Sequence, residues 1–291
     1  MIDYRFADGT ALVTGAAGGI GEALAHGLAA RGSDLVLLDR AGDRLALVAD
    51  EIRRRHPTVR VETVVADLSD HEATLALGAR LAREHPELTL VINNAGVALA
   101  GSFTELALDE FEWLMEINFR AVLTLTHALV PVLLTHPGSA LVNVSSVFGL
   151  IAPPSQTAYV TSKFAVRGLT ESLRAELLGR VGVTCVHPGG IATRIAVDAR
   201  IGEGADAGEV ARGLPAIDAL LRIPPPVAAE RILEGVRRRR ARVLIGASAW
   251  LPDLAARIAP SAYGRVLALL LAVGRRRVNR SRADRPRHGA G

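Results

Sequence analysis

The stretch TGAAGGIG, residues 14–21, stands between a short apolar run and a longer run with apolar residues at helical spacing. A glycine-rich turn between a strand and a helix lets the backbone approach a pyrophosphate, and the free N–H groups of the helix N-terminus attract its charge. Gly15 permits the tight turn, Gly19 the close approach and Gly21 the close packing of the helix, with Ile20 between the last two. The stretch therefore predicts a dinucleotide-binding turn.

The runs outward from this turn indicate a parallel sheet. Strands are expected at 10–15, 34–39, 59–67, 88–96, 139–146, 183–189 and 241–246. They are nearly continuous apolar runs, as in strands that are buried on both faces, and helical patterns separate them. We predict an α/β fold, a single-domain Rossmann-type doubly wound parallel sheet of about seven strands with helices on both faces.

The chain divides by charge as well as by pattern. Residues 1–236 carry 20 basic and 28 acidic side chains, whereas residues 237–291 carry 14 arginines and two acids. We predict a catalytic domain over 1–249, with a glycine-containing substrate lid at 195–225, and a helical C-terminal extension over 250–291. The basic end of this extension is expected to be disordered.

Composition narrows the class of protein. The single cysteine, Cys185, rules out an internal disulfide and fits a reducing compartment. No leader is recognised, and the apolar run at 266–273 is far shorter than a membrane span, so a cytoplasmic location is expected. No His, Cys or acid cluster has metal-ligand spacing, so no metal is expected. Nucleic acid is not expected either, because no aromatics are interleaved with the arginines and the body is acidic.

Two acids at predicted strand ends bear on the choice of cofactor. Asp39 ends the second strand, where a carboxylate can accept hydrogen bonds from ribose hydroxyls and would repel a 2′-phosphate, so NAD is favoured. Arg40 leaves NADP open, since a guanidinium can pair with that phosphate. Asp67, at the end of the third strand, is a candidate for the adenine edge or a cap for the following helix.

The chemistry is expected from Tyr159 and Lys163, the only lysine among 34 Lys and Arg residues. A spacing of four places both on one helix face. A nearby ammonium favours a phenolate and lowers its pKa, and lysine can titrate where arginine cannot. Two further predicted strand ends add polar groups, the serines of VNVSSVFG at 142–149, and Asn94, Ala95 and Gly96 of INNAG.

Together these motifs resemble the short-chain dehydrogenase/reductase family in its shorter, soluble form. The matching features are TGAAGGIG, NNAG, Asn118 in MEINF, the serine pair, Tyr159-xxx-Lys163 and HPGGIATRI at 187–195, in family order.

The resemblance implies a role for each matching residue. Tyr159 would be the general acid/base, Ser146 would polarise the substrate oxygen and Lys163 would bind the nicotinamide ribose. Asn118 would hold a water through which protons reach Lys163. The residues that would grip the nicotinamide are Pro188, Gly189, Ile191 and Thr193.

The predicted reaction interconverts a secondary alcohol and a ketone. A lipophilic substrate is expected, because the expected pocket residues are apolar: Val97, Val147, Phe148, Leu150 and Ile151. A homodimer or homotetramer is expected from the resemblance. The extension over 250–291 is expected to cover the substrate cleft or to form a subunit contact. Contact of this basic extension with a membrane surface is less favoured. Two alternative functions are an NAD(H)-binding regulator without turnover and a nucleotide-sugar epimerase or dehydratase.

Overall fold

The computed structural model describes residues 3–219 and 221–264. Its strands are β1 (Thr10–Thr14), β2 (Asp34–Asp39), β3 (Val61–Val65), β4 (Leu88–Asn93), β5 (Leu99–Ala100), β6 (Ala140–Val144), β7 (Gly182–Pro188), β8 (Arg200–Ile201) and β9 (Arg242–Ile245). Its α-helices are α1 (Gly19–Ala29), α2 (Gly42–Arg55), α3 (His71–Glu84), α4 (Leu108–Met115), α5 (Ala121–Leu134), α6 (Thr157–Glu176), α7 (Ala207–Asp218), α8 (Pro225–Arg237) and α9 (Ala247–Ile258). Three short turns complete the list: the π-helical η1 (Glu116–Arg120) and the 3₁₀ turns η2 (Val147–Gly149) and η3 (Arg194–Ala196).

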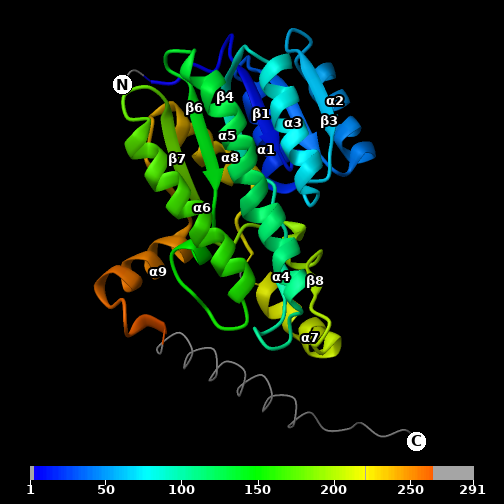
Figure 1. Cartoon of the computed structure of the whole chain (residues 1–291), viewed down its shortest axis with the longest axis vertical. Coiled ribbons are helices and arrows are strands. Elements are labelled where there is room, and N and C mark those ends of the chain that lie inside the picture. The colour runs from blue at the N-terminus through cyan, green and yellow to red at the C-terminus, as the bar shows by residue number, and fades with distance from the viewer. Residues whose placement is uncertain (1–2, 220, 265–291) are drawn as a thin grey trace, which may run out of the picture.

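Seven strands form one parallel sheet in the order β3-β2-β1-β4-β6-β7-β9 (Figure 1). The order reverses between β1 and β4, which are neighbours although two strands separate them in the chain. In open sheets of this kind, ligands bind at the carboxyl ends of the strands where the order reverses. The predicted doubly wound parallel sheet is confirmed.

Helices cover both faces of the sheet. The apolar core on one face joins α1, α2 and α8, and the core on the other joins α3, α5 and α6 (Figure 1). Alternation within a strand supplies both: Ala11 and Val13 of β1 belong to the first core, and Leu12 between them belongs to the second. This explains why the central strands are apolar along most of their length, whereas the edge strand β3 exposes Glu62.

Small residues set how closely the helices approach. A Cβ added at Gly235 of α8 would lie 2.3 Å from Cγ2 of Val243 in β9. Such a distance is far inside van der Waals contact, so this helix reaches the edge strand only because residue 235 has no side chain.

The structure also holds features that the sequence analysis did not predict. A second, two-stranded parallel sheet pairs β5 with β8 and thereby ties the expected lid, 195–225, to the segment after β4. That lid also contains η3 and α7. Helix α9 begins at Ala247, before the predicted start of the extension at residue 250. The tail expected to be disordered lies outside the described residues.

One continuous helical stretch, Leu108–Leu134, is long and apolar enough to cross a membrane by length and composition alone. It runs through α4, η1 and α5, and α5 contributes Leu125, Leu129 and Leu133 to the core with α3. Core helices of soluble proteins pass the same test, so the stretch is weak evidence for a span.

Gly235→Ala is expected to lower the free energy of unfolding by about 1–3 kcal/mol, because the added methyl group overpacks the contact between α8 and β9. Gly168→Ala in α6 is the matched control: nothing lies within 4 Å of its added Cβ, so it should stabilise the helix by about 0.5–1 kcal/mol. Urea denaturation measures the free energy of unfolding of both variants and of the wild type. Equal effects of the two substitutions would contradict the packing argument.

Candidate active site

The predicted site residues come together at the carboxyl edge of the sheet. Gly15 follows β1, Asn94 follows β4, Ser146 follows β6, and Pro188 ends β7. Because these four strands are parallel and adjacent, their ends lie side by side. The first turns of α6, with Tyr159 and Lys163, reach the same edge and contact η2.

The glycine turn has the geometry that the sequence predicts. Gly15 and Gly19 have positive φ angles of 68° and 57°, a region that favours glycine. A Cβ on Gly21 would lie 1.9 Å from the carbonyl oxygen of Gly15, so the first turn of α1 can pack against Gly15 only because residue 21 has no side chain. Gly18 caps α1 without a side-chain hydrogen bond, which leaves the first N–H groups of the helix available to an anion.

Thr14 connects this turn to the loop after β4. Its Oγ1 accepts hydrogen bonds from the backbone N–H groups of Asn94 and Ala95, each at 3.0 Å, and the Asn94 side-chain amide donates back to the Thr14 carbonyl at 3.0 Å. The sequence analysis assigned Asn94 and Ala95 to the cofactor. These donors bind Thr14 of β1, so Asn94 and Ala95 support the glycine turn, and their expected contact with the cofactor stays a prediction. The sequence motif alone did not reveal this role of Thr14.

Asp39 is fixed to the same turn by its carboxylate. Oδ2 accepts from the backbone N–H of Ala17 and Oδ1 from that of Ala41, both at 3.0 Å. Arg40 is exposed and pairs with no acid among the described residues. Arg44, which the sequence analysis did not single out, lies across the turn, donating to the carbonyl of Ala17 at 3.3 Å.

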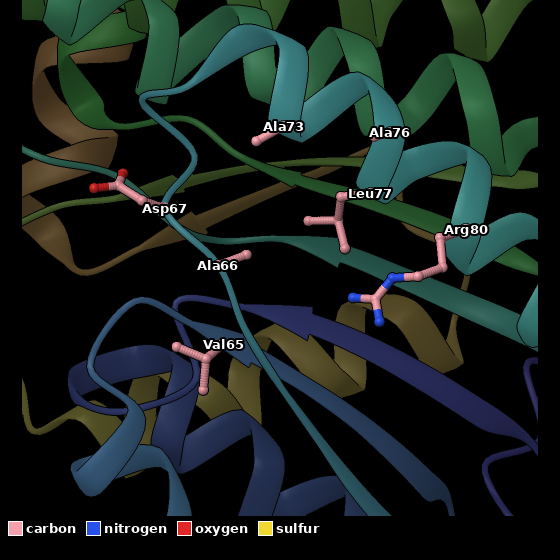
Figure 2. A pocket seen from close by; sticks show the side chains of 7 residues that line it. All are labelled: Val65, Ala66, Asp67, Ala73, Ala76, Leu77 and Arg80. Atoms are coloured by element: carbon pink, nitrogen blue, oxygen red, sulfur yellow. The ribbon is translucent and has the colours of Figure 1, made fainter.

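Asp67 lies beside a hollow of about 380 Å³ between the end of β3 and α3. Figure 2 shows Leu77 and Arg80 pointing into this hollow, whereas the Asp67 carboxylate points away from it. Asp67 accepts from Ser69 N–H at 2.9 Å, and α3 is capped by Asp70, which accepts from Ala73 N–H at 3.0 Å. The alternative that Asp67 caps this helix is therefore wrong.

The segment after β7 folds back over the glycine turn. Gly189 donates to the carbonyl of Ile245 at 3.0 Å, and Ile191 pairs with Ile223 in an isolated bridge. A Cβ on Gly19 would lie 3.1 Å from Cγ2 of Thr193, so Thr193 lies directly against the turn. Residues 188–193 therefore close one side of the expected cofactor site.

The Ser146 hydroxyl lies near the hydroxyl of Tyr159 and accepts a hydrogen bond from the backbone N–H of Phe148 at 3.1 Å. Phe148 packs edge-to-face on the Tyr159 ring, with centroids 6.1 Å apart. Burial raises the pKa of Tyr159 to about 12, and the neighbouring Ser146 hydroxyl opposes that rise. The phenol is thus protonated at neutral pH in this structure.

Lys163 is 3% exposed, and its ammonium lies 5.6 Å from the centre of the Tyr159 ring. Burial lowers the pKa of Lys163 to about 8. The expectation that Lys163 lowers the pKa of Tyr159 is not met in this structure, because burial of the phenol is the largest influence on that pKa and raises it. Nζ donates to the Val144 carbonyl at 3.2 Å, its one hydrogen bond within the described residues.

Asn118 lies in the π-helical turn η1, a kind of irregularity common at functional sites. Its Oδ1 accepts from Val97 N–H at 2.8 Å, and its Nδ2 donates to the Val97 carbonyl and to Ser162 Oγ. A Cβ on Gly96 would lie 3.2 Å from Asn118 Oδ1 and 3.3 Å from Lys163 Nζ, so both polar groups meet at Gly96. The arrangement clamps the loop after β4 to α6.

The residues present fit a nicotinamide dinucleotide. Uncapped N–H groups of α1 face the glycine turn, which suits a pyrophosphate. The buried ammonium of Lys163 has donors left for ribose hydroxyls.

The comparisons with known proteins agree with this geometry. A family model described as short chain dehydrogenase matches residues 9–204. SadH of Mycobacterium tuberculosis, provisionally named an oxidoreductase, is 38% identical over 261 residues, covering 89% of this chain and 93% of SadH. The chain belongs to the short-chain dehydrogenase/reductase family.

Solved structures of the family share the fold. A short-chain dehydrogenase/reductase from Burkholderia phymatum, solved with NAD, has a TM-score of 0.74 at 28% identity, covering 83% of this chain and 90% of that one. A short-chain dehydrogenase from Sphingobium yanoikuyae, solved with NADPH, has a TM-score of 0.71 at 28% identity, covering 97% and 98%. The prediction of an NAD(P)-dependent dehydrogenase/reductase is confirmed at this level.

Two residues within the family motifs support the site without being in the predicted set. Ser145 Oγ donates to the Lys163 carbonyl at 2.8 Å and so fixes the first turns of α6. His187 is fully buried, and its Nδ1 donates to the Ser146 carbonyl at 3.0 Å. Burial lowers the pKa of His187 to about 4, so it stays neutral and holds Ser146 by a hydrogen bond. Neither the serine pair nor the HPGGIATRI motif indicates these supporting roles from sequence alone.

Cys185, the one cysteine, is buried in β7. Burial raises the pKa of its thiol to about 12, so it is no nucleophile at neutral pH. Within the described residues no group of His, Cys, Asp or Glu could hold a metal ion.

An apolar wall adjoins Tyr159. Leu99, Leu114 and Ala158 form its buried part, and Val97, Leu106, Phe111 and Trp113 pack against them. Of the five expected substrate residues, Val97, Val147 and Phe148 are half-buried, whereas Leu150 and Ile151 are buried. Apart from Val97, the sequence analysis did not name the residues of this wall. Most of them belong to β5 and α4 or lie next to them, and these elements carry no family motif.

Proposed function

We propose that this enzyme interconverts a secondary alcohol and a ketone, with NAD as the preferred cofactor and a lipophilic compound as substrate. The observation that carries the proposal is the buried ammonium of Lys163, 5.6 Å from the centre of the Tyr159 ring, with the Ser146 hydroxyl near the phenol. A silent NAD(H) sensor has no use for a buried phenol held in this way.

The proposed roles follow from the donors and acceptors of each group. Bound nicotinamide supplies or takes up the hydride. In reduction, Tyr159 donates its proton to the carbonyl oxygen, and Ser146 donates a hydrogen bond to the same oxygen. An acid with a pKa of about 12 releases its proton reluctantly. The nearby Lys163 ammonium helps this proton transfer by stabilising the phenolate that forms.

The cofactor preference is proposed from Asp39. Its carboxylate is fixed on Ala17 and Ala41 at the end of β2, so it cannot turn away from a 2′-phosphate without losing two hydrogen bonds. Arg40 is exposed and its position is held by no acid in the described part of the chain, which makes it the weaker determinant.

A lipophilic substrate is supported by the apolar wall beside Tyr159. The alternative of a nucleotide-sugar epimerase or dehydratase would need a larger substrate domain after β7, whereas the elements described between β7 and α8 are the short η3, β8 and α7. A homodimer or homotetramer remains a prediction from the family resemblance.

Tyr159→Phe is expected to lower turnover by at least about 10²-fold, the usual loss when a general acid is removed, while NADH affinity stays within a factor of about two. Tyr263→Phe, the same chemical change outside the site, should leave both unchanged. Ketone reduction followed by NADH absorbance, with NADH binding followed by fluorescence, measures the pair. Unchanged turnover in Tyr159→Phe would overturn the assignment.

The pH profile should follow Lys163. Its ammonium is present below its pKa of about 8 and lost as pH rises through that value, so kcat/KM for NADH should fall above about pH 8. Lys163→Arg keeps the charge but not the compact shape. Because this buried site leaves little space beside Gly96, we expect activity to drop more than about tenfold, with no break near that pH. A flat wild-type profile would contradict the role.

Wild-type protein should bind NADH at least about tenfold more tightly than NADPH, and Asp39→Ala should narrow that ratio by removing the repulsion of the 2′-phosphate. Asp43→Ala, which removes a nearby exposed charge, is the control and should leave the ratio unchanged. Fluorescence titration with NADH and with NADPH measures both affinities in each protein. Tighter NADPH binding by the wild type would show that Arg40 dominates.

A further inference from the structure

Helix α9 exposes a row of large apolar side chains. Trp250, Leu251, Leu254 and Ile258 are 59%, 68%, 54% and 74% exposed, and their spacing of three and four places them along one side of the helix. Soluble proteins rarely leave such a contiguous row uncovered, and rows of this kind mark interaction surfaces. We call these four residues the α9 face.

The opposite side of the helix is fixed to the body. Ala249 is fully buried, and Asp253 accepts from Arg242 of β9 at 2.9 Å and from Arg257 at 3.0 Å. Ser248 Oγ accepts from Gly190 N–H at 3.1 Å, which joins the start of the helix to the segment after β7. Because the buried side is anchored in this way, the α9 face is presented outward.

The sequence from residue 237 onward, which includes α9, is strongly basic. From residue 237 to the C-terminus the sequence has 14 arginines and two acids, and one of those acids, Asp253, already binds two of the arginines. An apolar helix face with a Trp, continued by arginine-rich sequence, matches the surface of an anionic bilayer, where rings and leucines enter the headgroup boundary and arginines meet phosphates.

The position of α9 also fits such a surface. It contacts η2, which follows Ser146, and in Figure 1 it lies at the same end of the molecule as α4, α7 and β8. Further exposed apolar side chains stand at that end, namely Phe103, Leu108, Val197 and Ile201. A bilayer on the α9 face would therefore lie next to the side from which a lipophilic compound reaches Tyr159.

We propose that the α9 face docks on the surface of an anionic phospholipid bilayer, lying in the interface without crossing it. A second copy of the chain is a poorer occupant, because pairing two α9 faces would bring two arginine-rich segments together. Docking does not depend on turnover, so it stands or falls separately from the proposed reaction.

The test mixes the full chain with vesicles of phosphatidylcholine alone, or of phosphatidylcholine mixed with phosphatidylglycerol, and sediments them. Binding is expected to the anionic vesicles only and should weaken at high salt. The Trp emission should shift to the blue on binding. Trp250→Phe should keep binding and lose the shift, which separates Trp250 from Trp113.

The double substitution Leu251→Ser with Leu254→Ser should weaken vesicle binding at least tenfold. Leu178→Ser is the matched control: Leu178 is equally exposed, but it follows the C-terminus of α6, at the other end of the sheet. A second variant, in which Arg275, Arg276 and Arg277 become Gln, should also lose at least tenfold while leaving α9 intact. Turnover of a water-soluble ketone should be unchanged in all of them, which verifies folding.

Three results would overturn the proposal. The first is no vesicle binding, or equal binding to both vesicle types. The second is a dimer in light scattering that the Leu251/Leu254 double variant abolishes, which would assign the α9 face to a second copy. The third is Trp250 emission already blue-shifted without lipid in a monomer, which would mean that the chain's own 266–273 segment covers the face.

Discussion

The active site depends on the join between two strands that are neighbours in the sheet but distant in sequence. Thr14 ends β1, and through three hydrogen bonds with Asn94 and Ala95 it fixes the loop after β4 against the glycine turn. Gly96 then follows at a set position, where Asn118 and Lys163 approach it. A shift at this join would move the cofactor turn and the proton-transfer groups relative to each other, although they belong to different elements.

The second constraint is a charge held in the interior. In the part of the chain that the structure describes, the Lys163 ammonium has one acceptor, the Val144 carbonyl, and Ser145 holds the backbone of the same residue. A buried ammonium with so few partners destabilises the fold by itself, which is common where a group must meet a ligand. The supporting bonds from Ser145, Asn118 and His187 keep the surrounding backbone in place without neutralising that charge. Holding one reactive cation in the interior therefore requires supporting hydrogen bonds from several elements of the fold.

Sequence reasoning recovered the sheet, and the residues it named for catalysis lie together at one edge of that sheet, because strands and motifs both leave local patterns in the sequence. Strands buried on both faces are apolar throughout, and Gly15, Gly19 and Gly21 occupy conformations or contacts that only glycine tolerates. It did not recover β5 and β8, two-residue strands whose pairing is set by tertiary contacts. It also misjudged the pKa of Tyr159: a spacing of four shows that two side chains are near, but not how deeply both are buried. The roles of Thr14 and His187 depend on partners 80 and 41 residues away, which no local pattern encodes.

The strand order has a consequence for how the protein is made. The four strands β3, β2, β1 and β4 all come from residues 10–93, so one side of the sheet is complete in the first third of the chain. The strands that carry Ser146 and Pro188 are added afterwards, and the last, β9, joins near residue 245. During synthesis, which proceeds from the N-terminus, the half of the sheet that carries the glycine turn can therefore assemble before the groups that perform the chemistry leave the ribosome. The cofactor itself could then act as an early ligand for the nascent domain, stabilising its first half by mass action while the second is still being translated.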